Sequence, residues 1–484
     1  MRLSRVLVAL VALVVLAGLT AGVVTGTFGS WARSGLEATG LYSSGGASSL
    51  VPGGLATTTP GSAAPSATPS ASQASPDPVQ LKPVLAGATP AAKPAAAKVT
   101  KLINGVDRKG VKDAFSGTVI DVGTGAVLYG HKAKSGYIPA STMKLLTTTA
   151  ALSLLGPERR FTTKVVAPRS GSIILVGGGD PYLSSKPRDG RASISTLARR
   201  SADALKKQGV RKVSLGYDTS LFTGPAWNPT WPAAYADQVS KVSALWVNEG
   251  RVTGFSPGPR VSNPPAAAAT AFAAALKKQG ITVTKTAKAK APRGAASVAS
   301  VSSLPAERIV ELLLMASDND AAEVMFRQAA RAAGQPASFA GGRKAVHDRL
   351  QKLGVLDASV RIQDGSGLSR QTRVPADSMA KVLRVAMEEK HPELRGVVTG
   401  LPVAGVEGSL RVRFFDDATT NARGLVRGKT GTLTKVHSLA GFVRAPDGSM
   451  LAYAFLVNNP KNEYESIIWL DRVSAALARC GCSP

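Results

Sequence analysis

Residues 139–144 read Pro-Ala-Ser-Thr-Met-Lys, and the rest of the chain is organised around them. They open a run from Met143 to Leu155 that is rich in Leu, Ala and Thr and ends at Gly156-Pro157, which predicts a helix. Residues three apart on a helix lie on one face, so the Ser141 hydroxyl and the Lys144 amine can share a hydrogen bond. The pair is a candidate nucleophile beside a candidate base.

The Ser-x-x-Lys spacing alone is weak evidence for a catalytic pair, because a chain of this length contains about one or two such pairs by chance. Ser378 and Lys381 form a second pair with the same spacing. Only the first pair precedes two further stretches, Ser317-Asp318-Asn319 and Lys429-Thr430-Gly431-Thr432. Each of these is bland by itself, as a cap or a strand end. Together, in this order, they predict a serine acyl-transfer site at Ser141.

The residue types suit acyl transfer without histidine. Lys144 can accept the Ser141 proton only if part of it is neutral, and burial or the positive charge of Lys429 lowers a lysine pKa. Ser317 can relay a proton between Lys144 and the leaving amine. Asn319 can hold Lys144 or the substrate amide through its carboxamide.

The last motif suits the substrate side of the site. Lys429, Thr430 and Thr432, joined by Gly431, offer a positive charge and two hydroxyls to a substrate carboxylate. The backbone N–H groups of Ser141 and Thr432 are the candidate oxyanion hole.

Metal and cofactor chemistry is not indicated. The four histidines show no zinc-binding spacing, and no G-x-S-x-G elbow accompanies them. The two cysteines, Cys480 and Cys482, lie at the C-terminal tip, as either a strained disulfide or two free thiols. We therefore expect no metal and no cofactor.

The first hundred residues are not globular in composition. Arg2 and Arg5 precede an apolar run, so residues 1–30 read as either a signal peptide or an uncleaved membrane anchor. Residues 31–100, rich in Pro, Ala, Ser and Thr, predict a disordered linker. This arrangement indicates an exported protein of the cell wall or periplasmic space.

The net charge of +28 is concentrated in the folded body of the chain. Residues 166–295 hold 19 Lys/Arg and six Asp/Glu, which leaves +13 on this region. A basic surface attracts an anionic polymer. Outside the membrane, that favours acidic wall polymers or lipid headgroups over nucleic acid.

The folded body divides into three segments: a first catalytic segment at 101–164, a small inserted α/β domain at 165–295, and a second catalytic segment at 296–484. An antiparallel sheet with helices on both faces is expected for the two catalytic segments. Its expected strands are 116–121, 126–129, 425–429, 438–444 and 450–457, and its later helices are 306–315, 321–333, 375–390 and 463–478. The expected elements of the insertion are strands 173–176, 212–215, 239–247 and 281–286 and helices 193–207 and 266–278.

Taken together, residues 105–475 resemble the D-alanyl-D-alanine carboxypeptidase/endopeptidase family, the class C type of low-molecular-mass penicillin-binding proteins. The resemblance rests on the three motifs and on several further stretches: 120–128, 177–181, 242–249, 322–323, 364–370 and 405–411. It implies a penicilloyl-serine transferase (β-lactamase-like) fold with a domain inserted between the first two motifs. The 172 residues between Lys144 and Ser317 agree with that. Trp246 and Glu249-Gly250 depart from the family pattern.

The resemblance implies a serine-type D-Ala-D-Ala carboxypeptidase that acts on peptidoglycan stem peptides through an acyl-enzyme at Ser141. Penicillins are expected to acylate the same serine. Endopeptidase action on D-alanyl crosslinks is left open as a second activity. The alternatives are a β-lactamase and a non-catalytic protein that binds the cell wall.

Overall fold

The computed structural model describes residues 94–356 and 359–480. The expected signal or anchor, and the expected linker up to residue 93, lie outside these ranges. The end of the expected linker is wrong, because Ala96 begins helix α3 (Ala96–Asn104), in which Val99 is buried against the first sheet. Within the described ranges, no helix combines the length and apolar character needed to cross a membrane. Cys480 is buried and disulfide-bonded, whereas Cys482 is outside the described residues.

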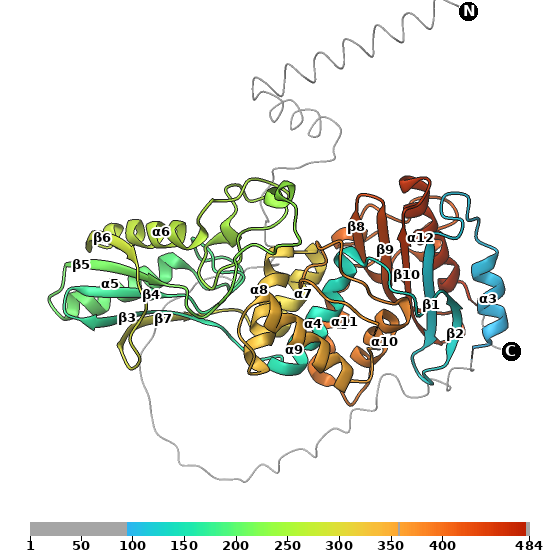
Figure 1. Cartoon of the computed structure of the whole chain (residues 1–484), viewed down its shortest axis with the longest axis horizontal. Helices are drawn as coiled ribbons and strands as arrows, with labels where there is room; N and C mark the ends of the chain where they lie inside the picture. Colours follow the sequence, from blue (N-terminus) through green and yellow to red (C-terminus); the bar gives the residue numbers. More distant parts are fainter. Residues whose placement is uncertain (1–93, 357–358, 481–484) are drawn as a thin grey trace, which may run out of the picture. The chain divides into compact units, whose positions relative to one another are not determined.

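The first sheet is antiparallel and has the order β2-β1-β10-β9-β8 (Figure 1). The early hairpin therefore pairs with the last strands of the chain, in the register Phe115 opposite Val457. Its strands are β1 (Phe115–Asp121), β2 (Val127–His131), β8 (Arg427–Leu433), β9 (Val436–Arg444) and β10 (Met450–Asn458).

The central strand β10 is apolar at nearly every position because both faces of the sheet are covered. Leu451, Tyr453 and Phe455 lie in the apolar cluster shared with α3 (Ala96–Asn104) and α12 (Glu463–Ala478). The residues between them point the other way, as successive strand side chains must. They pack against a layer of helices that carries the first two motifs: α4 (Met143–Leu155), α7 (Ala306–Ala316), α8 (Asn319–Ala332), α9 (Phe339–Lys352), α10 (Ala376–Ala386) and α11 (Arg395–Thr399).

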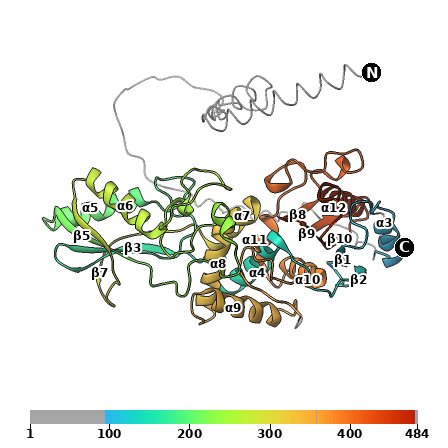
Figure 2. The same ribbon diagram turned by 45° about the horizontal axis from the view of Figure 1, so that its top comes forward.

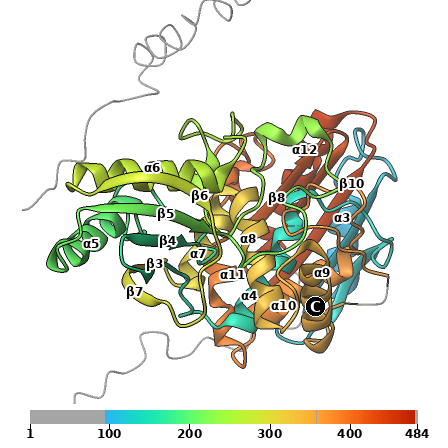
Figure 3. The ribbon, with the colours of Figure 1, turned by 60° about the vertical axis from the view of Figure 1, so that its left-hand side comes forward.

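Residues 162–302, which we call the insert, form a second sheet of order β6-β5-β4-β3-β7. Helices α5 and α6 pack on each other and share one apolar cluster with the sheet, so they cover the same face (Figure 3). Figures 1 and 2 show α7 and α8 between the two sheets. The insert elements are β3 (Thr162–Arg169), β4 (Ser172–Val176), α5 (Ile194–Lys207), β5 (Lys212–Asp218), α6 (Pro264–Lys278), β6 (Thr282–Lys288) and β7 (Ala296–Ser302).

Two expected strands differ in the structure. The expectation for 239–247 is wrong, because the segment pairs with no strand and runs as a buried loop. Val239, Val242 and Trp246 are apolar because they fill the core beside α8, not because they belong to a sheet. The strand expected at 425–429 is β8 instead, which begins two residues later and runs through the whole Lys-Thr-Gly-Thr motif.

Candidate active site

Ser141 lies in a 3₁₀ turn, η1 (Ala140–Thr142), immediately before α4. Ala140 has a φ of 49°, in the left-handed region that a residue with a Cβ rarely adopts. The turn is held from two sides, because the Thr142 and Ser438 hydroxyls both donate to the Pro139 carbonyl at 2.7 Å. Ser438 belongs to β9, so the turn that carries the candidate nucleophile is fixed to the first sheet.

Gly367 supports the same turn from the tight loop at 364–370, one of the stretches that carry the resemblance. It has a φ of +83°, and a Cβ there would lie 1.9 Å from the Ala140 carbonyl oxygen. We expect Gly367→Ala to lower the melting temperature and slow acylation of Ser141. Gly334→Ala is the matched control, because Gly334 has a φ of +70° but nothing within 4 Å of its Cβ.

Backbone strain should cost the control about 1 kcal/mol. The clash at Gly367 should add roughly 2 kcal/mol or more. Thermal unfolding of the two variants measures the difference. Equal melting temperatures would mean that Gly367 does not support the nucleophile turn.

Lys144 is fully buried on the first turn of α4 and contacts the candidate nucleophile, Ser141. Its Nζ donates to Ser141 Oγ at 2.8 Å, to Asn319 Oδ1 at 2.7 Å and to the Ser366 carbonyl at 2.9 Å. Burial lowers the pKa of Lys144 to about 8, although nearby carboxylates, Asp318 foremost, act in the opposite direction. A large neutral fraction near pH 8 is what a general base at this position requires.

Lys429 and Ser317 form a second pair on the other side of the site. Lys429 Nζ donates to Ser317 Oγ at 2.8 Å and to the Thr430 carbonyl at 2.8 Å. Burial, and then the charge of Lys144, lower the pKa of Lys429 well below its usual range. Ser317 has a φ of 56° at the break between α7 and α8, which turns its hydroxyl from the helix line toward β8.

A cleft of about 740 Å³ opens over these groups. Ser141, Ser317, Asn319, Thr430 and Thr432 line it, together with insert residues that include Tyr235, Asp237 and Gln238. Lys429 lies behind the cleft wall rather than in it. The insert therefore supplies one wall of the cleft, and the motif residues supply the other.

β8 passes very close to the nucleophile. A Cβ on Gly431 would lie 2.6 Å from the Pro139 carbonyl oxygen and 3.1 Å from the Ser141 nitrogen. Only glycine permits this approach. Next to it, Thr430 Oγ1 donates to Ser409 Oγ at 2.7 Å, which ties the motif to the stretch at 405–411.

Two buried carboxyl groups behind Lys144 were not predicted as site residues. Glu323 accepts hydrogen bonds from the Gly365 and Ser366 nitrogens, and burial raises its pKa to about 8. Asp364 accepts from Trp231 Nε1 at 2.7 Å and from backbone nitrogens of its own loop. Both fix the loop whose carbonyl holds Lys144. They lie in stretches that carried the resemblance, which was the only signal for them.

The competing pair, Ser378 and Lys381, forms no comparable site. Ser378 is buried on α10, whereas the Lys381 amine is partly exposed and pairs with Asp377 at 2.7 Å. Neither residue lines the cleft at Ser141.

Comparisons with known proteins identify the family of the chain. The model of the D-Ala-D-Ala carboxypeptidase 3 (S13) family matches residues 97–254 and 251–476. The chain belongs to that family. It is 35% identical to the carboxypeptidase DacB of Mycolicibacterium smegmatis over 76% of this chain and 81% of the relative. It is 28% identical to the D-alanyl-D-alanine carboxypeptidase of Actinomadura sp. R39, over 81% and 88% of the two chains.

A solved structure also shares the fold. Penicillin-binding protein 4 (dacB) from Haemophilus influenzae superimposes with a TM-score of 0.65 at 21% identity, over 79% of this chain and 99% of that one. The expected fold, with its inserted α/β unit, is confirmed. Family membership makes the chain a serine-type D-Ala-D-Ala carboxypeptidase, and neither alternative, a β-lactamase or a silent wall-binding protein, is favoured.

Proposed function

We propose that the protein removes the terminal D-alanine from peptidoglycan stem peptides outside the cytoplasm, through an acyl-enzyme at Ser141. The observation that carries this proposal is the buried Lys144 amine, 2.8 Å from Ser141 Oγ and 2.7 Å from Asn319 Oδ1. A buried lysine with a lowered pKa beside a serine is an activated nucleophile pair.

In the acylation step, Ser141 Oγ attacks the carbonyl carbon of the D-Ala-D-Ala amide while its proton passes to Lys144. The N–H groups of Ser141 and Thr432 stabilise the oxyanion. As the tetrahedral intermediate collapses, the C–N bond breaks and Ser317 relays the proton from Lys144 to the leaving amine, which leaves Lys144 neutral again. Water then attacks the ester and gives a proton to Lys144. Lys144 returns this proton to Ser141 Oγ as the acyl C–O bond breaks and the shortened peptide leaves.

Thr430 and Thr432 line the cleft and are the proposed partners of the substrate's terminal carboxylate. Lys429 lies directly behind them, and its amine donates a hydrogen bond to Ser317 Oγ. A bound carboxylate would raise the lowered pKa of Lys429 and so restore its positive charge. Substrate binding and proton delivery through Ser317 are then linked.

β-Lactams should acylate Ser141, because their strained amide resembles the D-Ala-D-Ala bond. The solved penicillin-binding protein 4 of Haemophilus influenzae that shares the fold is also known in complex with a β-lactam. We propose that residues 1–30 export or anchor the enzyme and that the chain from residue 31 up to the start of α3 is a spacer. The charge of +13 on residues 166–295 then favours contact with anionic wall polymer.

Two substrates test the proposal and separate the two peptidase activities. The purified protein should release D-alanine from a stem peptide that ends in D-Ala-D-Ala, as measured by amino-acid analysis. A D-alanyl-crosslinked dimer, assayed in parallel, measures the endopeptidase activity. One equivalent of penicillin should stop both. If penicillin is instead hydrolysed rapidly, with no accumulation of acyl-enzyme, the β-lactamase alternative replaces this proposal.

A further inference from the structure

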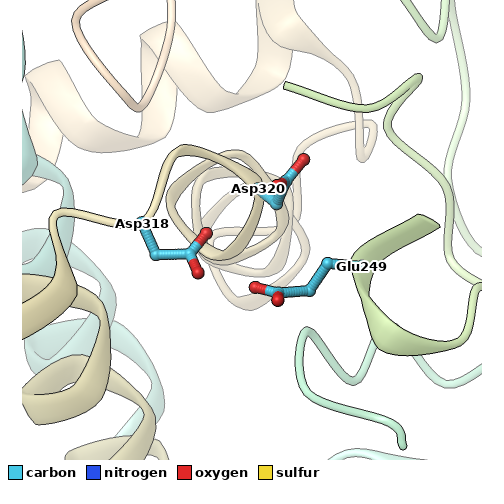
Figure 4. A group of neighbouring side chains, drawn as sticks. All are labelled: Glu249, Asp318 and Asp320. Atoms are coloured by element: carbon cyan, nitrogen blue, oxygen red, sulfur yellow. The ribbon is translucent and has the colours of Figure 1, made fainter. Parts of the chain in front are cut away.

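Three buried carboxyl groups meet beside the middle motif: Glu249, Asp318 and Asp320 (Figure 4). Asp318 and Asp320 flank Asn319 at the start of α8. Glu249 comes from the insert, on the 3₁₀ turn η3 (Asn248–Gly250), and its carboxyl group points toward that of Asp318 in Figure 4. One oxygen from each of the three groups lies within 4.8 Å of the others. Such closeness requires compensation by positive charge.

Two insert arginines supply that compensation. Arg251 contacts all three carboxyl groups: Nη1 lies 3.2 Å from Glu249, and Nη2 lies 2.8 Å from Asp318 and 3.3 Å from Asp320. Arg260 Nη2 lies 3.1 Å from Asp320. A guanidinium therefore already neutralises the cluster, and the geometry makes no case for a metal ion.

The third carboxyl group, Glu249, differs from the two aspartates. Burial, and then the negative charge of Asp318, raise the pKa of Glu249 well above its usual range, which favours its protonated form. Asp318 and Asp320 are the carboxyl groups closest to the Nη2 atoms of the two arginines. The network is thus a compensated ion cluster that spans the insert and α8.

The same segment of the insert holds the backbone and side chains on either side of Asn319. Asp320 Oδ1 accepts from the Ser240 nitrogen at 2.6 Å, and Asn319 Nδ2 donates to the Gln238 carbonyl at 3.1 Å. Asp318 caps α8 through the Ala321 nitrogen at 3.0 Å. The side chains of Asp318, Asn319 and Asp320 therefore each form a hydrogen bond with a backbone group. For Asn319 and Asp320, that backbone group belongs to the insert.

We propose that Arg251 is a positioning residue for acyl transfer: by holding Asp318 and Asp320 it sets the orientation of Ser317 and Asn319 toward the two active-site lysines. This rests on the catalytic roles proposed above for Ser141, Lys144, Ser317 and Asn319. The insert is then a working component of the active site, not only a surface for binding wall polymer.

Arg251 also acts on Lys144 indirectly, through the charges of Asp318 and Asp320. The charged and titratable groups that face Lys144 are Lys429 on β8, Asp318, Asp320 and Glu323 at α8, and Asp364 in the tight loop. The carboxylates favour the protonated amine, and burial opposes them. Without Arg251, the charges of Asp318 and Asp320 are less compensated, so the pKa of Lys144 rises. The acylation rate rises with pH as Lys144 loses its proton, and we call this rising part of the pH–rate profile its acidic limb. Without Arg251, the acidic limb should move to higher pH.

The test compares full-length Arg251→Gln, Arg251→Lys and Arg188→Gln with the wild type. Arg188 is an insert arginine whose exposed side chain pairs only with the neighbouring Asp189 among the described ion pairs, so it serves as the matched control. The readouts are the second-order rate constant of labelling by a fluorescent penicillin, measured from pH 6 to 10, and the melting temperature.

Arg251→Gln should label between about tenfold and 100-fold more slowly, with the acidic limb moved up by about half a pH unit or more. Arg251→Lys keeps the positive charge but not the contact with all three carboxyl groups. It should recover part of the labelling rate, and its acidic limb should lie close to the wild-type pH. Arg188→Gln should match the wild type.

A folded Arg251→Gln variant with an unchanged rate and limb overturns the proposal. So does a slower rate that lysine does not rescue and that leaves the limb in place, because that pattern is general destabilisation. If Arg251→Gln does not fold, Arg251→Lys decides alone: an intermediate rate supports the proposal and an unchanged rate overturns it. Failure of the catalytic assignment looks different, because then the wild type itself would not be labelled at Ser141.

Discussion

Ser141→Ala should abolish covalent labelling by a fluorescent penicillin and reduce D-alanine release by at least about 10³-fold. Among the described hydroxyls, Ser141 Oγ is the one to which the Lys144 amine donates a hydrogen bond, at 2.8 Å. The change removes one oxygen atom from a residue of a turn that is held by Pro139, Thr142 and Ser438. The fold and melting temperature should therefore persist. Gel fluorescence and mass spectrometry of the labelled protein measure the result.

The matched control is Ser378→Ala, which alters the other serine with the same spacing to a lysine. Ser378 is buried on α10, and Lys381 pairs with Asp377 instead of with a serine. This variant should label at the wild-type rate. Stoichiometric labelling of Ser141→Ala, or loss of labelling in folded Ser378→Ala, would refute the assignment of the nucleophile.

Lys144→Met should slow acylation by about 10²- to 10⁴-fold, the usual contribution of a general base. Methionine fills the buried space of the lysine stem but cannot accept a proton. In the proposed mechanism Lys144 acts when neutral, and burial lowers its pKa to about 8. The acylation rate should thus rise with pH up to about 8 and then level off. In Lys144→Met this limb should disappear. Stopped-flow measurement of penicillin acylation from pH 6 to 10 records both effects.

Lys381→Met is the control for loss of a lysine from the competing pair, and it should keep both the rate and the pH profile. If Lys144→Met retains a limb near pH 8, the titrating group is another one. Lys429 would then be the first to examine, because its amine is also buried and lies on Ser317.

Much of the site could be predicted because each motif occurs in a characteristic local structure. A serine at a helix start, a serine and an asparagine at a helix break, and a lysine in a strand next to a close-packed glycine are recognisable one by one. Their order along the chain singled out Ser141 over Ser378. The distance of 2.7 Å between Lys144 and Asn319, which are 175 positions apart, is a product of the tertiary fold.

The features that could not be predicted depend on tertiary packing. Residues 239–247 are apolar enough for a strand, but periodicity alone does not distinguish a strand from a buried loop. β7, composed of Ala, Ser and Val, has no apolar pattern that would mark it. Nothing local in Glu249 or Arg251 indicates that they meet α8, because the partner carboxylates lie about 70 positions away in sequence.

The two ends of the insert lie side by side where they join the catalytic domain. Thr162 on β3 pairs with Ser302 on β7, and the Phe161 nitrogen and carbonyl both bond to Ser303, at 2.8 and 2.9 Å. A short turn could close the chain there, so one genetic event could add or remove the whole module. A chain that lost it would also lose Arg251 and Arg260, leaving buried Asp318 and Asp320 without their arginine partners. Loss of the insert in evolution would therefore also require substitutions at the start of α8.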